Sequence, residues 1–191
     1  VVVTDEASTV MVHKNSSAGA TDWTATAGSE DIDGYYPVSY CPAGSDDIYV
    51  VAAKKTTQES LMFNRSDDGG ETWAVAEYAL PYAEEAYGID FIASACYQVV
   101  AKGNDVYVLY GANFCDMILM HSDSKGDIGT WTSQVLVNFP IDNFDGAAGE
   151  TTDFDGDGDK DTIASSDGKL EMIIEDDGTV HVFSGRIRVY D

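Results

Sequence analysis

The sequence predicts an all-β fold, a propeller-type array of four-stranded antiparallel sheets in which each sheet forms one blade. Two observations predict it. Short segments rich in β-branched and aromatic residues recur along the 191 residues, bounded by Gly, Asp, Asn or Ser, and helical patterns are nearly absent. Similar segments also return at a regular spacing, which indicates a repeat architecture.

Two independent markers measure the repeat. DDIYVV, which contains Tyr49, matches NDVYVL, which contains Tyr107, 58 residues later. Trp73 and Trp131 are also 58 residues apart, and Trp23 precedes Trp73 by 50. All three tryptophans follow an apolar run and a polar turn. Antiparallel strands recurring at this period are typical of a propeller blade, whose hydrophobic faces are buried only when neighbours stack.

The period divides the chain into units. A complete unit reads as four strands, such as YPVSYC, DIYVVAA, SLMFNR and AVAEYAL, and the last unit predicts separate strands at LEMIIED, TVHVFSG and RIRVYD. YAEEAY, at 82–87, is too short for an ordinary helix and predicts a turn or linker. The expected layout is a partial unit over 1–34, complete units over 35–88 and 89–140, an acidic insertion over 141–162, and a partial unit over 163–191.

Only about three to four units are expected, whereas closed propellers have about four to eight blades. We therefore expect a partial propeller that belongs to a longer polypeptide. A ring closed by self-association is the alternative.

The charge of the chain limits its partners. Thirty-four acidic residues against ten basic ones give a formal net charge of −24. Nucleic acid is an unfavourable partner because its phosphates would be repelled. The composition favours solubility, bound cations or a saline environment. No apolar run approaches the roughly 18 residues of a membrane helix, so we expect no membrane insertion. The start VVVTDEAS lacks a basic region and a cleavage site. We therefore expect that any export signal was removed or never included.

The three cysteines, Cys41, Cys96 and Cys115, form no CxxC pair, which argues against a zinc site. Cys96 and Cys115 flank one predicted hairpin and are the favoured disulfide. Three free thiols are the alternative.

The turn that ends at Trp73 carries the most specific motif. The segment Ser66–Trp73 fits Ser-x-Asp-x-Gly-x-Thr-Trp in full. It resembles the Asp-box, or BNR, repeat of sialidases and related secreted propellers. Asp68 can accept backbone N–H bonds, Gly70 can take a positive φ, and Trp73 can pack between blades. The resemblance implies a structural role away from any catalytic centre for Ser66, Asp68, Gly70, Thr72 and Trp73.

The other two copies of this turn depart from the pattern. Ser16 to Trp23 lacks the Asp at the third position, and Ser122 to Trp131 is about two residues too long. We expect looser hairpins there.

A second motif is DFDGDGDKD, at 153–161. Its carboxylates at positions 1, 3, 5 and 9, with a glycine at position 6, suit a Ca²⁺ loop, because a hard cation takes six to eight oxygens and the glycine allows the turn. An EF-hand needs Glu at position 12, where Ala164 stands. The spacing resembles the calcium loops of integrin-type propellers instead. That resemblance implies side-chain ligation by Asp153, Asp155, Asp157 and Asp161, and ligation by the backbone carbonyl of Asp159.

No catalytic residue is assigned. Sialidases use an arginine triad and an Arg-Ile-Pro motif, whereas this chain has Arg-Ile-Arg at 186–188 and three arginines in all. Carboxylate pairs such as Asp46 and Asp47 are expected to be solvated surface. Most of the aromatic residues near strand ends are expected to serve core or inter-blade packing, and a sugar-binding surface is the alternative. These residues are Tyr35, Tyr36, Tyr40, Tyr82, Tyr87, Tyr97, Tyr110 and Phe114.

The sequence thus favours a secreted or cell-surface module that binds glycans or protein partners and is stabilised by calcium. One alternative is a sialidase-like glycoside hydrolase whose catalytic residues lie largely outside this segment. Another is a structural subunit of an extracellular assembly.

Overall fold

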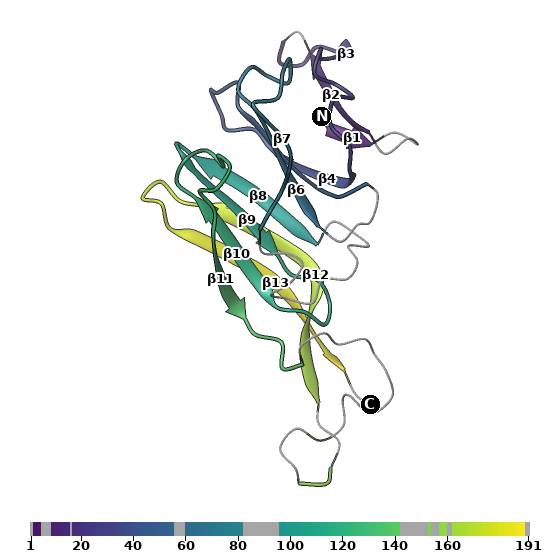
Figure 1. Cartoon of the computed structure of the whole chain (residues 1–191), viewed down its shortest axis with the longest axis vertical. Coiled ribbons are helices and arrows are strands. Elements are labelled where there is room, and N and C mark those ends of the chain that lie inside the picture. The colour runs from purple at the N-terminus through teal and green to yellow at the C-terminus, as the bar shows by residue number, and fades with distance from the viewer. Residues whose placement is uncertain are drawn as a thin grey trace.

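The computed structural model describes residues 2–4, 9–15, 17–55, 60–81, 96–141, 153, 157–159 and 162–189. Every regular element in these ranges is a β-strand, which confirms the all-β class (Figure 1). The described residues accordingly include no helix long and apolar enough to cross a membrane. The predicted turn or linker at 82–87 lies outside them.

The first two sheets are antiparallel and follow the chain order. The first has the order β1-β2-β3, and the second has the order β4-β5-β6-β7. The strands are β1 (Val2–Thr4), β2 (Val10–Asn15), β3 (Trp23–Ala25), β4 (Tyr35–Tyr40), β5 (Ile48–Ala53), β6 (Leu61–Ser66) and β7 (Val75–Ala79).

The next sheet is again a four-stranded antiparallel meander, in the order β8-β9-β10-β11, and a two-stranded hairpin follows it. The strands are β8 (Tyr97–Lys102), β9 (Asp105–Tyr110), β10 (Met117–Ser122), β11 (Thr132–Val137), β12 (Ile163–Ile174) and β13 (Val180–Val189). The prediction of four-stranded antiparallel sheets is therefore confirmed.

Alternating side chains explain how one sheet can serve two cores. Along β9, Val106, Val108 and Tyr110 join the large core with β5 and β6, whereas Leu109 joins a second core with β12. Successive residues of a strand point to opposite faces, so an almost continuous apolar run such as VYVLY requires cover on both sides. The central sheets are layers covered on both faces.

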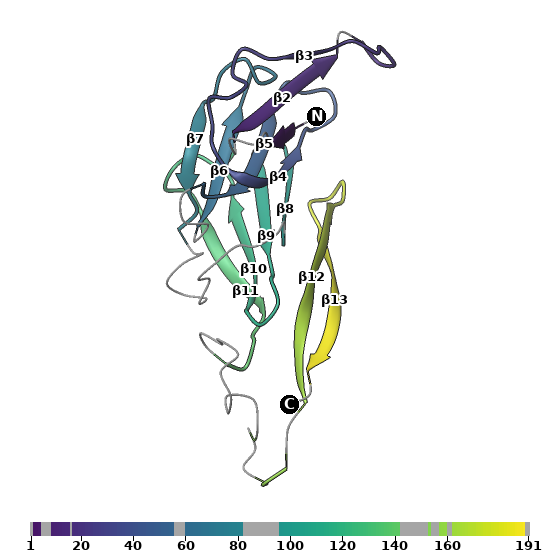
Figure 2. The same ribbon diagram turned by 90° about the vertical axis from the view of Figure 1, so that its right-hand side faces the viewer.

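The sheets are stacked in chain order. The large core lies between the β4–β7 and β8–β11 sheets, and Phe63, Tyr97 and Tyr110 at 0–1% exposure are among its largest side chains. A smaller core around Val10, Ile32 and Val50 joins β2 to the β4–β7 sheet. On the opposite side, the hairpin β12–β13 lies along the other face of β8 and β9 (Figure 2).

The final unit differs from the prediction. TVHVFSG and RIRVYD were expected to be separate strands, but β13 runs through both as one strand, and β12 begins at Ile163, well before LEMIIED. Register between the two strands shifts between Ser166 and Leu170, where an irregularity absorbs extra residues. One long hairpin forms in place of the shorter strands because β12 and β13 pair on both sides of this irregularity.

Candidate functional site

The Ser66–Trp73 turn uses its polar side chains to hold its own backbone. Asp68 Oδ1 accepts hydrogen bonds from the Thr72 backbone N–H at 2.8 Å and from the Ser66 hydroxyl at 2.8 Å, and Oδ2 accepts one from the Thr72 hydroxyl at 2.6 Å. These bonds, with those of Thr72 first, lower the pKa of Asp68 to about 2. The Asp68 carboxylate is therefore committed to the turn.

The same turn packs on the preceding sheet. Gly70 has φ of 90°, and a Cβ there would lie 2.9 Å from a methyl carbon of Val12 in β2. Trp73 donates its ring N–H to the Gly28 carbonyl at 2.8 Å. Glycine is needed because both the backbone conformation and the close approach exclude a side chain. The turn thus joins two sheets.

The Ser122–Trp131 turn repeats this arrangement despite its extra length. The Ser122 hydroxyl accepts the N–H of Gly126 at 3.0 Å, as the Ser66 hydroxyl accepts that of Gly70 at 2.8 Å. A Cβ on Gly126 would collide with the Phe63 ring of the preceding sheet, and the Trp131 ring meets Phe63 edge-on at 4.9 Å. The expectation of a loose hairpin is wrong here, because the additional residues lie between Gly126 and Trp131, and both of these still pack on Phe63.

The three tryptophans are not equally buried. Trp131 is 5% exposed, Trp73 is partly buried, and Trp23 is 50% exposed. Two of them therefore contact a preceding sheet, and the Trp23 ring remains largely accessible.

A charged cluster reinforces the junction between the two complete sheets. Arg65 donates to the Lys125 carbonyl at 2.9 Å and to Asp127 Oδ1 at 2.8 Å, and Lys125 Nζ lies 3.0 Å from Asp47 Oδ2. Burial raises the pKa of Asp47, but hydrogen bonding and attraction by Lys125 outweigh it, so the pKa is lowered. The prediction that Asp47 is solvated surface is wrong, since its side chain is 13% exposed.

Only part of the predicted calcium loop is described. Asp153 Oδ2 accepts the N–H of Gly158 at 2.9 Å, Asp157 Oδ1 accepts that of Asp159 at 2.8 Å, and Gly158 has φ of 90°. The glycine at position 6 thus makes the turn expected of it. Asp155 and Asp161 lie outside the described residues, and among the described residues no three acidic, His or Cys side chains form a metal-binding group. The all-oxygen donor chemistry suits Ca²⁺.

The cysteines are free thiols. Cys96 is buried, Cys115 is partly buried and Cys41 is exposed. The favoured Cys96–Cys115 disulfide is therefore absent, and the alternative of three free thiols describes the chain. The Cys115 thiol donates to the Ala112 carbonyl at 3.4 Å, and burial raises its pKa.

Most of the described aromatic residues near strand ends serve packing, as expected. Tyr97 and Tyr110 are buried, Tyr97 donates to the Tyr36 carbonyl at 2.6 Å, and Phe114 meets Phe139 edge-on. Tyr36 is exposed to 42%. Tyr82 and Tyr87 lie outside the described residues. These residues pack because strand-end tyrosines of a stacked sheet face its neighbours.

Trp23 is an accessible aromatic residue beside charged groups, and the sequence did not single it out for binding. It lines a cleft of about 260 Å³ with Lys14 and Asp46. Within the described ranges, the Lys14 ammonium and the Asp46 carboxylate make no hydrogen bond or ion pair. The remaining lining residues are Val12, His13, Asn15, Ser39, Cys41, Ser45, Asp47, Ile48 and Gly69. This cleft combines a flat apolar surface with uncommitted charged groups, and it is the candidate functional site.

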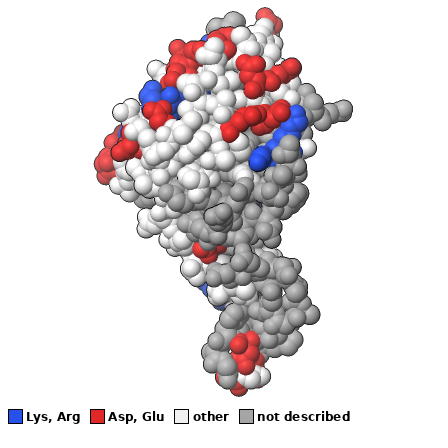
Figure 3. Space-filling model, viewed as in Figure 1, with Lys and Arg blue, Asp and Glu red and all other residues white. Residues whose placement is uncertain are grey.

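Its surroundings are acidic. Red carboxylate side chains gather over the end of the molecule that carries the first two sheets, and few basic side chains interrupt them (Figure 3). Such a surface disfavours polyanionic ligands and favours neutral, polyhydroxylated or cationic ones.

Comparisons of the chain with protein-family models, with curated proteins and with solved structures found no match, so the site is interpreted from its own residues.

Proposed function

We propose that this chain is part of a secreted or cell-surface β-propeller-type module that binds neutral glycans. The observation that carries the proposal is the Trp23 cleft. An exposed indole offers a flat surface to the C–H face of a sugar ring, and carboxylate and ammonium groups at its edge pair with hydroxyls. A volume of about 260 Å³ suits one sugar residue of a longer glycan.

The propeller assignment rests on the stacking of successive sheets and on the two turns that pack on the preceding sheet. The calcium assignment rests on the spacing of Asp153, Asp155, Asp157, Asp159 and Asp161 and on the turn at Gly158. In this proposal, calcium orders the acidic insertion and takes no part in contacting the glycan.

The test is a titration of neutral oligosaccharides followed by tryptophan fluorescence. Trp23 is the most exposed of the three tryptophans, so a sugar stacked on it should shift the emission to shorter wavelength. Trp23→Ala should abolish saturable binding, because the stacking surface is lost. Asp46→Asn should weaken binding about tenfold through the loss of one charged hydrogen-bond acceptor.

Ile128→Ala is the matched control, since Ile128 is 69% exposed and is not among the described residues that line the cleft. Binding that survives Trp23→Ala unchanged contradicts the proposed site. Hydrolysis of a fluorogenic sialoside by the chain would instead favour the glycoside hydrolase alternative.

A further inference from the structure

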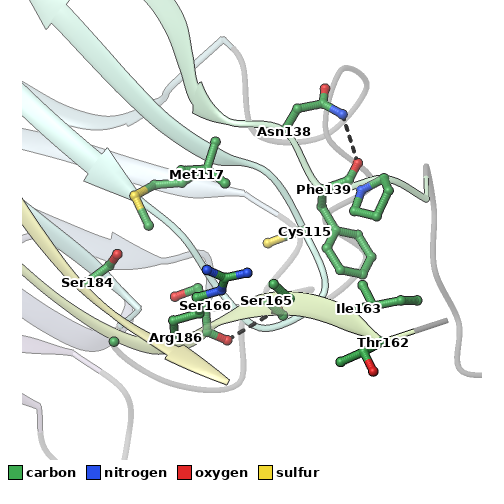
Figure 4. A pocket seen from close by; sticks show the side chains of 14 residues that line it. Cys115, Met117, Asn138, Phe139, Thr162, Ile163, Ser165, Ser166, Ser184 and Arg186 are labelled. Atoms are coloured by element: carbon green, nitrogen blue, oxygen red, sulfur yellow. Dashed lines mark hydrogen bonds between the residues drawn. The ribbon is translucent and has the colours of Figure 1, made fainter. Parts of the chain in front are cut away.

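A second and larger cleft lies at the other side of the stack. Its volume is about 700 Å³, and it is bounded by the segment after β11 and by the β12–β13 hairpin (Figure 4). Small-molecule sites have volumes of about 300 to 1,000 Å³ and are lined mainly by apolar side chains. The lining consists of Cys115, Met117, Val137, Asn138, Phe139, Pro140, Thr162, Ile163, Ala164, Ser165, Ser166, Ser184, Gly185 and Arg186.

The walls of this cleft are fixed by the fold. Met117 and Ile163 are 5% and 4% exposed, and Phe139 is 3% exposed. The Phe139 backbone N–H donates to Asp116 at 2.7 Å, and the Ser165 hydroxyl accepts the Phe114 N–H at 2.7 Å. These bonds tie both walls to the loop after β9, so the apolar surface is in place before any ligand arrives.

Among the described residues that line the cleft, Arg186 is the single charged one. No hydrogen bond or ion pair joins its guanidinium to another residue in the part of the chain that the structure describes. That is unusual in a chain with 34 acidic residues and only 10 basic ones. Figure 4 shows the Arg186 side chain beside Ser166, and the Ser184 hydroxyl also belongs to the lining.

We propose that this cleft binds a small amphipathic carboxylate, with its apolar body against Met117, Val137 and Ile163 and its carboxylate on Arg186. The charge complementarity selects the anion, because a guanidinium donates two parallel hydrogen bonds to a carboxylate. The apolar walls select against a bare inorganic anion or a sugar acid. This site is separate from the Trp23 cleft and is independent of the glycan-binding proposal.

The test compares octanoate with octanamide, which has the same apolar body and no charge, by isothermal titration calorimetry with the whole chain. Octanoate should bind about tenfold or more tightly than octanamide, because only octanoate makes a charged hydrogen bond to Arg186. Arg186→Gln should reduce the affinity for octanoate to that for octanamide. Arg188→Gln is the matched control, because Arg188 is exposed on the same strand and outside the lining; it should leave both affinities unchanged.

Location is tested through Cys115, whose thiol lines the cleft. In a Cys41→Ser background, octanoate should slow the alkylation of Cys115 with the same concentration dependence as binding. Ala164→Phe, which fills the cleft, should remove binding of both ligands while the thermal midpoint shows that the chain remains folded. Equal affinity for octanoate and octanamide in the unmodified chain, no saturable binding, or octanoate binding unaffected by Arg186→Gln would each overturn the proposal.

Discussion

At the scale of single residues, the Asp68 carboxylate is the clearest example of a side chain committed to structure. Three hydrogen bonds of 2.6 to 2.8 Å reach it from Ser66 and Thr72. From its exposure alone, the Asp68 carboxylate could be mistaken for part of a binding site in so acidic a chain. The bonds explain instead why the pKa of Asp68 is lowered to about 2.

Asp68→Ala should lower the thermal unfolding midpoint, and the difference should depend on pH. A carboxyl whose pKa is depressed by folding contributes stability that is present above its unfolded pKa of about 3.9. That contribution is lost as the pH falls toward about 2. The midpoints of the two proteins, measured by circular dichroism from pH 7 to pH 2, should therefore converge between about pH 4 and pH 2.

Asp31→Ala serves as the control because Asp31 is exposed and its carboxylate makes no hydrogen bond within the described ranges. A constant difference between Asp68→Ala and the unmodified chain across this pH range would contradict the role assigned to Asp68.

The three thiols should differ in reactivity in the native chain. Cys41 is exposed, whereas Cys96 is 3% exposed, so access differs most between these two. With a disulfide reagent at pH 8, one fast phase should come from Cys41 and vanish in Cys41→Ser, and Cys96 should react only after denaturation. If fewer than three thiols react after denaturation, the chain contains a disulfide that the structure does not.

At the scale of elements, the Arg65 cluster recurs in altered form on the next sheet. Tyr49 pairs with Arg65 across β5 and β6, and Tyr107 pairs with His121 across β9 and β10. On the second of these sheets Asp105 bonds His121 at 2.8 Å, and the Tyr107 ring stacks on His121 at 4.4 Å. The same strand positions therefore carry a tyrosine and a cationic or titratable partner in both repeats.

Arg65→Ala should destabilise the chain by about 2 kcal/mol, because partly buried hydrogen bonds of a charged group to the Lys125 carbonyl and to Asp127 are lost. Chemical denaturation of Arg65→Ala, Asp127→Ala and the double variant measures the coupling. We expect a coupling of about 1 kcal/mol or less, since Asp127 is 58% exposed and solvent screens the pair.

Arg188→Ala is the comparison for this series because Arg188 is exposed and makes no ion pair among the described residues; it should change the stability by less than about 0.5 kcal/mol. Equal effects of Arg65→Ala and Arg188→Ala would show that the cluster does not hold the two sheets together.

At the scale of the whole molecule, a net charge of −24 opposes folding through self-repulsion, and the stacked apolar sheets must overcome it. Bound cations relieve this repulsion most where carboxylates are crowded, as they are at 153–161. Calcium is therefore expected to act on stability.

Millimolar Ca²⁺ should raise the thermal midpoint relative to EDTA. A concentration about one hundred times the dissociation constant contributes about 2.7 kcal/mol, or about 5 to 10 °C for a chain of this size. Asp157→Asn should remove most of the shift, because a proposed ligand carboxylate is lost. Glu171→Gln, which alters an exposed carboxylate on β12, should retain it. An unchanged midpoint on addition of EDTA would remove the calcium assignment.

The sequence by itself determined most strands and their grouping into two four-stranded sheets. The strands follow from the alternation of side chains within short segments. The grouping follows from the repeat along the chain that places Tyr107 58 residues after Tyr49. It also identified the turn at Ser66–Trp73, in which the hydrogen bonds of the Asp68 side chain join neighbours in sequence. The turn at Gly158 was predictable for the same reason.

Tertiary structure alone decided which side chains the stack covers and which it leaves accessible. Burial depends on the neighbouring sheet, so Trp131 is covered by Phe63 while Trp23, at a similar motif position, stays exposed. Asp47 meets Lys125 only because two sheets pack face to face, and Arg186 reaches an apolar cleft only because the hairpin lies along β8 and β9. Contacts between residues distant in sequence arise from packing, and no local pattern encodes them.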